Sequence, residues 1–156
     1  MPGIEIVEAP GQRVLGVRRK GGYRLIPQLL MEVYEYAVNR EIPIAGPPVF
    51  LCHETSPEAV KEADCRGDAD IEVAWPVSRP AAGSGDIRGY ELPGGKMVHT
   101  VHKGPYENCE PTYLALFAWI GEHNLRISGP IREVYLNDPG TVRPEEIVTG
   151  IFVPVE

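Results

Sequence analysis

Apolar and polar positions along the first half of the chain predict the order strand, helix, strand, strand. Residues 13–18 have the pattern of a strand, and apolar residues then recur at helical spacing from Ile26 to Ala37. Two more strands are expected at residues 49–53 and 71–77. Residues 56–70 between them are polar, and we expect a loop there.

The second half predicts the same order of elements. A strand is expected at residues 96–102, and the helix after it has an inner stripe formed by Cys109, Thr112, Tyr113, Leu116, Phe117 and Ile120. The closing strands are expected at residues 133–136 and 148–155, and the small residues of 80–85 link the halves. This order predicts an α+β fold in one domain, residues 1–156. Duplicated strand-helix-strand-strand modules, 4–78 and 87–156, would form a curved antiparallel sheet with two helices and a central ligand cleft.

The two halves also match residue by residue at an offset of 83. Pro10-Gly11 corresponds to Pro93-Gly94, and Gly46-Pro47 corresponds to Gly129-Pro130. Near the end of each half the offset falls to 78, which shortens the last loop of the second copy by five residues. Two copies are too few for a solenoid, so we expect a duplicated unit folded against its twin.

One acidic residue stands out in this comparison. Glu133 lies in an expected strand of β-branched and aromatic residues, and its counterpart in the first half is Phe50. If Phe50 packs inward, Glu133 and Tyr135 point inward too. A buried carboxylate must be paired or protonated. Two interpretations stay open: Arg132, Arg126 or a backbone group pairs with it, or it lies at the base of a pocket that receives a cation or a reactive group.

Aromatic residues could supply the lining of such a pocket. Aromatic side chains at helical spacing also fit a core, so it is the set around one inward acid that suggests a binding site. A flat aromatic cation would gain buried area, cation–π contacts and a counter-charge there. The candidate ligand-binding residues are Glu133, Tyr135, Tyr106, Tyr113, Phe117, Trp119, Tyr34, Phe50 and Trp75.

Composition narrows the function classes. The formal net charge of −7 over 156 residues argues against a surface that follows nucleic-acid phosphates. No apolar run is long enough for a membrane helix, and the N-terminus has no signal-peptide pattern, so we expect a cytoplasmic protein with free thiols at its three cysteines. His99 and His102 are poorly spaced for a metal or haem site. We expect no metal and no cofactor.

Several motifs resemble those of a known family. They are residues 90–96 (Tyr-Glu-Leu-Pro-Gly-Gly-Lys), Gly104-Pro105-Tyr106, Trp119, Gly129-Pro130, residues 133–139 and Val153-Pro154-Val155. Together they resemble the GyrI-like small-molecule-binding family, the effector-binding domain of AraC-type and multidrug-sensing MerR-type regulators. The similarity is clear over residues 87–156 and weaker over 4–78.

The resemblance implies a groove between the two modules that binds bulky, hydrophobic and often cationic molecules. The family's acidic groove residue falls on Glu133, its glycine-proline-tyrosine motif places a groove tyrosine at Tyr106, and its second helix places a tryptophan at Trp119. Regulators carry this domain beside a helix-turn-helix domain, for which the two modules leave no room. We therefore expect a stand-alone version that does not itself bind DNA.

Stand-alone members are connected with drug sequestration, with hydrolysis of strained cyclopropanoid electrophiles and with gyrase inhibition, and all three stay open. In a hydrolase, Glu133 would be the general base, with Tyr106 or Tyr135 orienting water or stabilising the developing anion. An interaction module could bind gyrase or a regulator through the acidic segment from Glu54 to Asp70. The sequence does not choose an oligomeric state.

Overall fold

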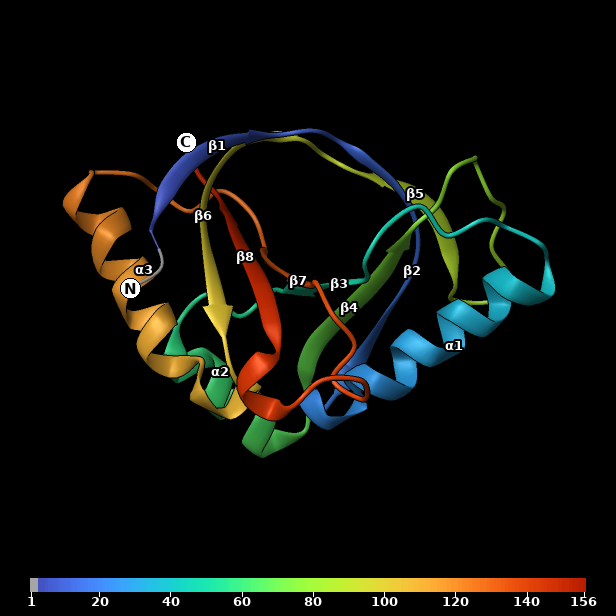
Figure 1. Cartoon of the computed structure of the whole chain (residues 1–156), viewed down its shortest axis with the longest axis horizontal. Helices are drawn as coiled ribbons and strands as arrows, with labels where there is room; N and C mark the ends of the chain where they lie inside the picture. Colours follow the sequence, from blue (N-terminus) through green and yellow to red (C-terminus); the bar gives the residue numbers. More distant parts are fainter. Residues whose placement is uncertain (1–2) are drawn as a thin grey trace.

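The computed structural model describes residues 3–156, which contain one eight-stranded sheet and three α-helices. The α+β class and the curved antiparallel sheet are confirmed (Figure 1). The strands are β1 (Glu5–Ala9), β2 (Gln12–Gly21), β3 (Val49–Cys52), β4 (Ala69–Pro76), β5 (Arg88–Leu92), β6 (Gly95–Lys103), β7 (Ile131–Tyr135) and β8 (Val148–Pro154). The helices are α1 (Ile26–Asn39), α2 (Pro57–Arg66) and α3 (Glu110–Glu122).

The strand order reflects the internal duplication. The strands lie side by side as β1-β6-β8-β7-β3-β4-β2-β5. Strands at equal distances from the two ends of this order, such as β6 and β2, or β7 and β3, are those that correspond in the sequence repeat. The sheet therefore has an approximate two-fold axis between its central strands, β7 and β3.

Two strand pairs that the sequence pattern did not predict connect the modules. β1 pairs with β6 of the other half, and β5 pairs with β2. The chain runs from β1 into β2 and from β5 into β6, so that two arcs span the sheet at the top of Figure 1. The arcs meet at the repeated Pro-Gly pairs, where a Cβ on Gly94 would lie 2.5 Å from both Ala9 O and Gly11 N. This close backbone approach explains why glycine stands at the repeated position.

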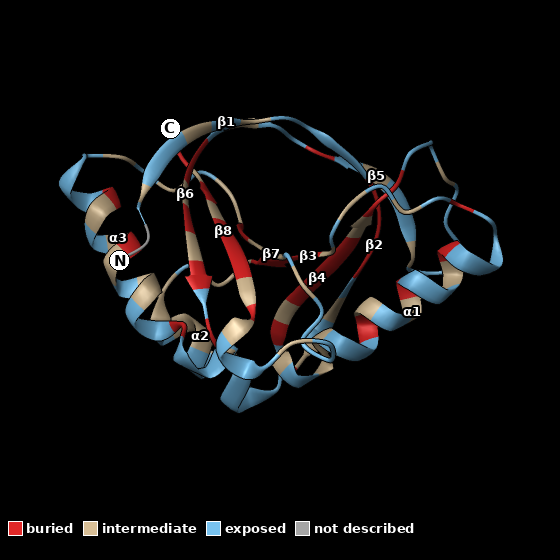
Figure 2. Ribbon diagram, in the orientation of Figure 1, coloured by how far each residue is buried: buried red, intermediate tan, exposed pale blue. Residues whose placement is uncertain are grey.

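Helices α1 and α3 cover one face of the sheet. Each has a proline in its first turn, where the missing N–H has no intrahelical partner to lose. Their buried stripes, Leu29, Val33 and Ala37 in α1 and Leu116 and Ile120 in α3, pack against inward residues of the strands. Their outer surfaces are exposed (Figure 2). We call this face of the sheet the helix-covered face. A second, smaller apolar cluster, which includes Val49 and Leu51, lies on the opposite face.

The structure contains a third helix where the sequence pattern predicts a polar loop. Ser56 caps α2 by accepting a hydrogen bond from Ala59 N at 3.1 Å, and Gly67 ends the helix with a φ of 69°. Only Val60 and Ala63 of α2 pack against the core, so the apolar period was too weak to predict it. Two acids of this segment are paired: Glu62, in α2, with Arg66, and Asp70, in β4, with Arg18.

None of the helices in residues 3–156 combines the length and the apolarity that a membrane crossing requires.

Candidate functional site

Glu133 lies at the centre of the helix-covered face. It is directly opposite Phe50 in the antiparallel pair of β7 and β3, at the approximate two-fold axis. Phe50 is only 4% exposed and belongs to the core under the helices, so the prediction that it packs inward is confirmed. Glu133 faces the same side, because strand neighbours directly opposite each other share a face. The duplication thus places an acid where its symmetric counterpart is a phenyl ring.

Two tyrosine hydroxyls satisfy the Glu133 carboxylate. Tyr113, on α3, donates to Oε2, and Tyr135, two residues along β7, donates to Oε1 at 3.1 Å. Burial raises the pKa of Glu133 above its ordinary value, although the two hydroxyls and the nearby His102 act in the opposite direction. Burial and the Glu133 charge raise the pKa of both tyrosines well above its ordinary value. These phenols therefore stay neutral and act as donors.

The arginines considered as partners for Glu133 lie elsewhere. Arg132 is on the opposite face and donates to Pro93 O at 2.7 Å. Arg126 pairs with Glu156 at 2.7 Å. Within residues 3–156, Glu133 has no basic side chain within ion-pair distance. Its only hydrogen-bond partners there are uncharged, which leaves the acid available to a cation.

Other polar groups surround this acid. The Tyr106 ring meets the Tyr135 ring edge to face at 5.4 Å, and Tyr106 is 38% exposed, so it lies at the outer edge of the group. His102 donates from Nε2 to Pro105 O at 3.0 Å, and its Nδ1 is hydrogen-bonded to the Thr112 hydroxyl at 2.9 Å. Thr149 lies opposite both Tyr135 and His102, is fully buried, and its hydroxyl has no partner in the described structure. A buried hydroxyl without a partner is a free hydrogen-bonding group beside the acid.

The remaining candidates are not all gathered at Glu133. Phe117 packs against Tyr113, with ring centroids 6.1 Å apart, and so extends the group along α3. Trp119 instead stacks on His123 near the end of the helix. Tyr34 and Trp75 contact each other at 5.1 Å, and the Trp75 indole donates to Leu30 O, under α1. The structure thus groups Glu133, Tyr135, Tyr113, Tyr106, Phe50 and Phe117, and places Trp119, Tyr34 and Trp75 in other contacts.

The two surface cavities found in the described chain do not include these residues. One, of about 490 Å³, lies beside α1 and residues 79–84, and the other, of about 450 Å³, lies beside His102 and Thr112. The central cleft stays a prediction.

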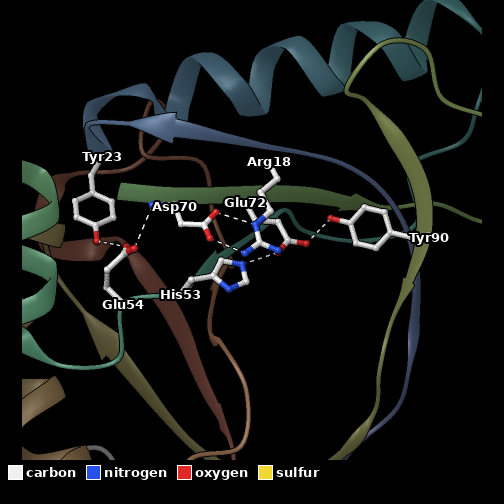
Figure 3. A network of polar contacts seen from close by, with 7 residues as sticks. All are labelled: Arg18, Tyr23, His53, Glu54, Asp70, Glu72 and Tyr90. Carbon is white, nitrogen blue, oxygen red and sulfur yellow. Dashed lines mark hydrogen bonds and ion pairs between the residues drawn. The ribbon is translucent and has the colours of Figure 1, made fainter. Parts of the chain in front are cut away.

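A second acid–tyrosine pair, Glu54 with Tyr23, lies in the first module (Figure 3). Tyr23, the counterpart of Tyr106, donates its hydroxyl to Glu54, and Glu54 also accepts from Asp70 N at 3.1 Å. In the second module Asn137 accepts from Val148 N in the same way, at 3.0 Å. The tyrosine ring meets Phe50 at 6.0 Å. Glu54 therefore has a structural role that an uncharged residue fills in the other copy.

A polar network on the opposite face joins the first module to β5 of the second (Figure 3). Glu72 accepts from the Tyr90 hydroxyl at 2.6 Å and bonds His53 Nε2 at 2.7 Å. Beside it, Arg18 holds Asp70 with two hydrogen bonds, at 2.7 and 2.5 Å. The bonds to His53 and Tyr90 outweigh burial and lower the pKa of Glu72. Unlike Glu133, this buried acid has an imidazole partner.

The comparison with family models agrees with the fold. Residues 3–156 match the model of the GyrI-like small molecule binding domain. The chain belongs to this family. Among curated proteins, none matches the chain.

Solved structures share the fold of this GyrI-like chain at low identity. The EcmrR C-terminal domain superposes with a TM-score of 0.87 at 19% identity, covering 100% of this chain and 98% of that domain. EcmrR in its DNA complex gives 0.86 at 19% identity, covering 99% of this chain but 57% of EcmrR. A hydrolase from Listeria innocua, lin2189, gives 0.70 at 16% identity, with 98% and 91% covered. SAV2435 bound to tetraphenylphosphonium gives 0.62 at 12% identity, with 99% and 94% covered.

Sequence reasoning missed several residues that lie near Glu133. Cys52 lies two positions along β3 from Phe50 and shares its face. Burial, followed by the Glu133 charge, raises the pKa of its thiol to about 12, so it is a neutral neighbour of the acid. The strand period of two could have identified Cys52. His102 and Thr149 contact the site through pairing of β6, β7 and β8, which no local pattern reveals.

Proposed function

We propose that this GyrI-like chain binds a lipophilic cation on the helix-covered face, with Glu133 as the counter-charge. The observation that carries the proposal is the state of Glu133: a half-buried carboxylate at the centre of the helix-covered face, held by two phenol hydroxyls and by no basic side chain in residues 3–156. A cation would supply the missing charge, and removal of the pair from water would strengthen the attraction.

The tyrosines fit this role in two ways. Their hydroxyls hold the carboxylate while no ligand is bound, and their ring faces attract cations. Tyr106 and Phe117, at the edges of the group, would contact the apolar body of the ligand. The family match supports a small-molecule ligand, and SAV2435, a distant structural neighbour, is a protein seen with the lipophilic cation tetraphenylphosphonium.

A calorimetric titration with matched ligands tests the proposal. Tetraphenylphosphonium carries a charge, and triphenylphosphine oxide offers a similar aromatic body without one. We expect the wild-type chain to prefer the cation, and Glu133→Gln to weaken the cation at least about tenfold while changing the neutral compound little. Equal losses of affinity for both compounds in Glu133→Gln would show that Glu133 does not act through its charge.

Glu72→Gln is the matched control for this titration. It removes a buried carboxylate that also accepts from a tyrosine hydroxyl, but on the opposite face of the sheet. The control variant should bind the cation as the wild type does. A loss equal to that of Glu133→Gln would mean that the ligand responds to net charge or to stability rather than to the Glu133 site.

Hydrolysis of a strained electrophile is the second candidate function. The observation that favours it is the raised pKa of Glu133 beside two neutral phenols. Glu133 would take a proton from water as the water oxygen bonds to the strained carbon. The electrons of the broken ring bond would pass to an attached electron-withdrawing group, which the carboxylic acid then protonates. Turnover of a cyclopropane-bearing ester by the wild type, lost in Glu133→Ala, would support it.

A further inference from the structure

The linker between the two modules forms a cavity at the end of α1. Residues 79–84 fold back beside the helix, and together with Tyr36, Arg40 and Ile42 they line a shallow cavity of about 490 Å³ that is open to solvent. Two hydrogen bonds hold the linker there. The Tyr36 hydroxyl donates to Ala82 O at 3.0 Å, and Arg79 donates to Glu41 O at 3.0 Å. The cavity is therefore made by ordered contacts on both of its sides.

Two guanidinium groups of this cavity have no acidic partner. Arg40 lies over the Tyr36 ring, with its central carbon 4.0 Å from the ring centroid, and it forms no ion pair within residues 3–156. Arg79 uses one of its five N–H groups, on a carbonyl oxygen. Acidic residues outnumber basic ones by 22 to 15 in the sequence, and most arginines do pair: Arg13, Arg18, Arg19, Arg66, Arg126 and Arg143. Arg24, Arg88 and Arg132 also lack an acidic partner within residues 3–156, so Arg40 and Arg79 are distinguished by lining one cavity.

The corresponding place in the second module differs. Trp119 and His123 are the counterparts of Tyr36 and Arg40, and the imidazole stacks on the indole at 3.7 Å, as the guanidinium lies over the tyrosine. The His123 Nδ1 bonds Trp119 O at 2.8 Å, so this nitrogen is already occupied. In both copies, a side chain that can carry a positive charge stacks on an aromatic ring at the helix end. The two neighbouring guanidinium groups and the linker belong to the first copy.

From this geometry we propose that the linker cavity binds a small anion with an apolar body, of the class of aromatic carboxylates and phosphate monoesters. The free N–H edges of Arg40 and Arg79 hold the anionic group, because guanidinium matches carboxylate and phosphate oxygens in geometry and charge. Ile42, Pro80 and Ala81 contact the body. This site is separate from the Glu133 group and takes ligands of the opposite charge.

Two-dimensional amide NMR of the 15N-labelled chain tests the proposal with three probes: 1-naphthoate, 1-naphthyl phosphate and the neutral 1-naphthamide. We expect one or both anions to shift the amides of residues 79–84, Tyr36 and Arg40, and the amide compound to bind about tenfold more weakly. The anion with the higher affinity then shows whether the cavity prefers a carboxylate or a phosphate group. Shifts confined to the Glu133 region, or equal affinity for the neutral probe, would overturn the proposal.

Two substitutions sharpen the test. Arg40→His copies the second module at the same position, and Arg79→Gln removes the other charge. Each should weaken the better anion about fivefold, with the thermal midpoint close to that of the wild type because both side chains are exposed. His123→Arg, the reverse exchange, should leave anion affinity unchanged, since no linker lies beside it. Unchanged affinity in both Arg40→His and Arg79→Gln would contradict the site. Tetraphenylphosphonium at saturation should not displace the anion, so the two proposals can fail separately.

Discussion

Phe50 and Glu133 lie directly opposite each other in neighbouring strands, although 83 positions separate them in the sequence. The neighbouring strand pairs are related by the same axis. Val49 faces Val134, and their respective counterparts in the repeat, Arg132 and Leu51, also face each other. A duplicated fold brings the two equivalent residues together only where its two-fold axis passes. A substitution in one copy at this position therefore changes the centre of the sheet.

Glu133→Gln should alter the pH dependence of stability in a defined direction. A carboxyl whose pKa is raised by folding stabilises the fold below its unfolded pKa, about 4.3, and that contribution is lost as pH rises through the folded value. The free energy of unfolding of the variant should therefore decline less between pH 4 and pH 8 than that of the wild type. Urea unfolding at both pH values measures it. A variant several kcal/mol less stable at neutral pH would mean that the acid is paired within the protein.

Glu72→Gln should change the pH dependence of stability in the opposite direction. Its pKa is lowered by His53 and Tyr90, so its stabilising contribution is present above the unfolded pKa and disappears as pH falls through the folded value. At neutral pH the variant should lose about 3 kcal/mol of unfolding free energy, and the loss should shrink as the wild type is acidified below about pH 4. Chemical unfolding over this range measures both. A loss that does not depend on pH would indicate packing rather than charge.

Tyr113→Phe should raise the pKa of Glu133 further. The variant removes a hydroxyl that donates to the ionised form and leaves the aromatic body in place. NMR titration of the side-chain carboxyl carbon follows the change directly. The onset of cation binding should move to higher pH by the same amount, because the ionised carboxylate is the binding form. Tyr34→Phe, on α1, is the control. A change in the pKa of Glu133 in that variant would argue against a local effect of the Tyr113 hydroxyl.

Phe50→Ala should act through packing alone. Phe50 is nearly inaccessible to solvent, and its loss should reduce the free energy of unfolding by about 3–5 kcal/mol. If a ligand contacts this ring, cationic and neutral compounds should weaken by similar factors, since no charge is removed. Thermal unfolding and calorimetry on the same preparation separate the two effects. Selective loss of cation affinity would place the charged end of the ligand at Phe50 rather than at Glu133.

The fold was predictable to the extent that each element has its own apolar period. The inner stripes of α1 and α3 and the strands around Phe50 and Glu133 follow from local spacing, and the repeat supplied the duplication. Helix α2 was missed because Val60 and Ala63 are its only residues packed on the core, although its Ser56 cap and Gly67 end were visible in the sequence. β1 and β5 were missed because they are mostly exposed and depend on pairing with the other module.

The site was predictable where symmetry applies and not where side chains reach across elements. The correspondence of Glu133 with Phe50 indicated its direction, and the strand period placed Tyr135 beside it. That Tyr113 rather than an arginine would satisfy the acid depends on the height of α3 above β7, which the sequence does not encode locally. Trp119 shares the helix with Tyr113 but lies at its far end, where it stacks on His123.

A structure of the chain soaked with tetraphenylphosphonium tests the central claim most directly. The account predicts that the phosphonium centre lies on the helix-covered face next to the Glu133 carboxylate, with the Tyr113 and Tyr135 hydroxyls turned away from it and their rings against the phenyl groups. The Arg40 and Arg79 cavity should stay free of the cation. A ligand bound elsewhere, with both tyrosine hydroxyls still on Glu133, would contradict the account.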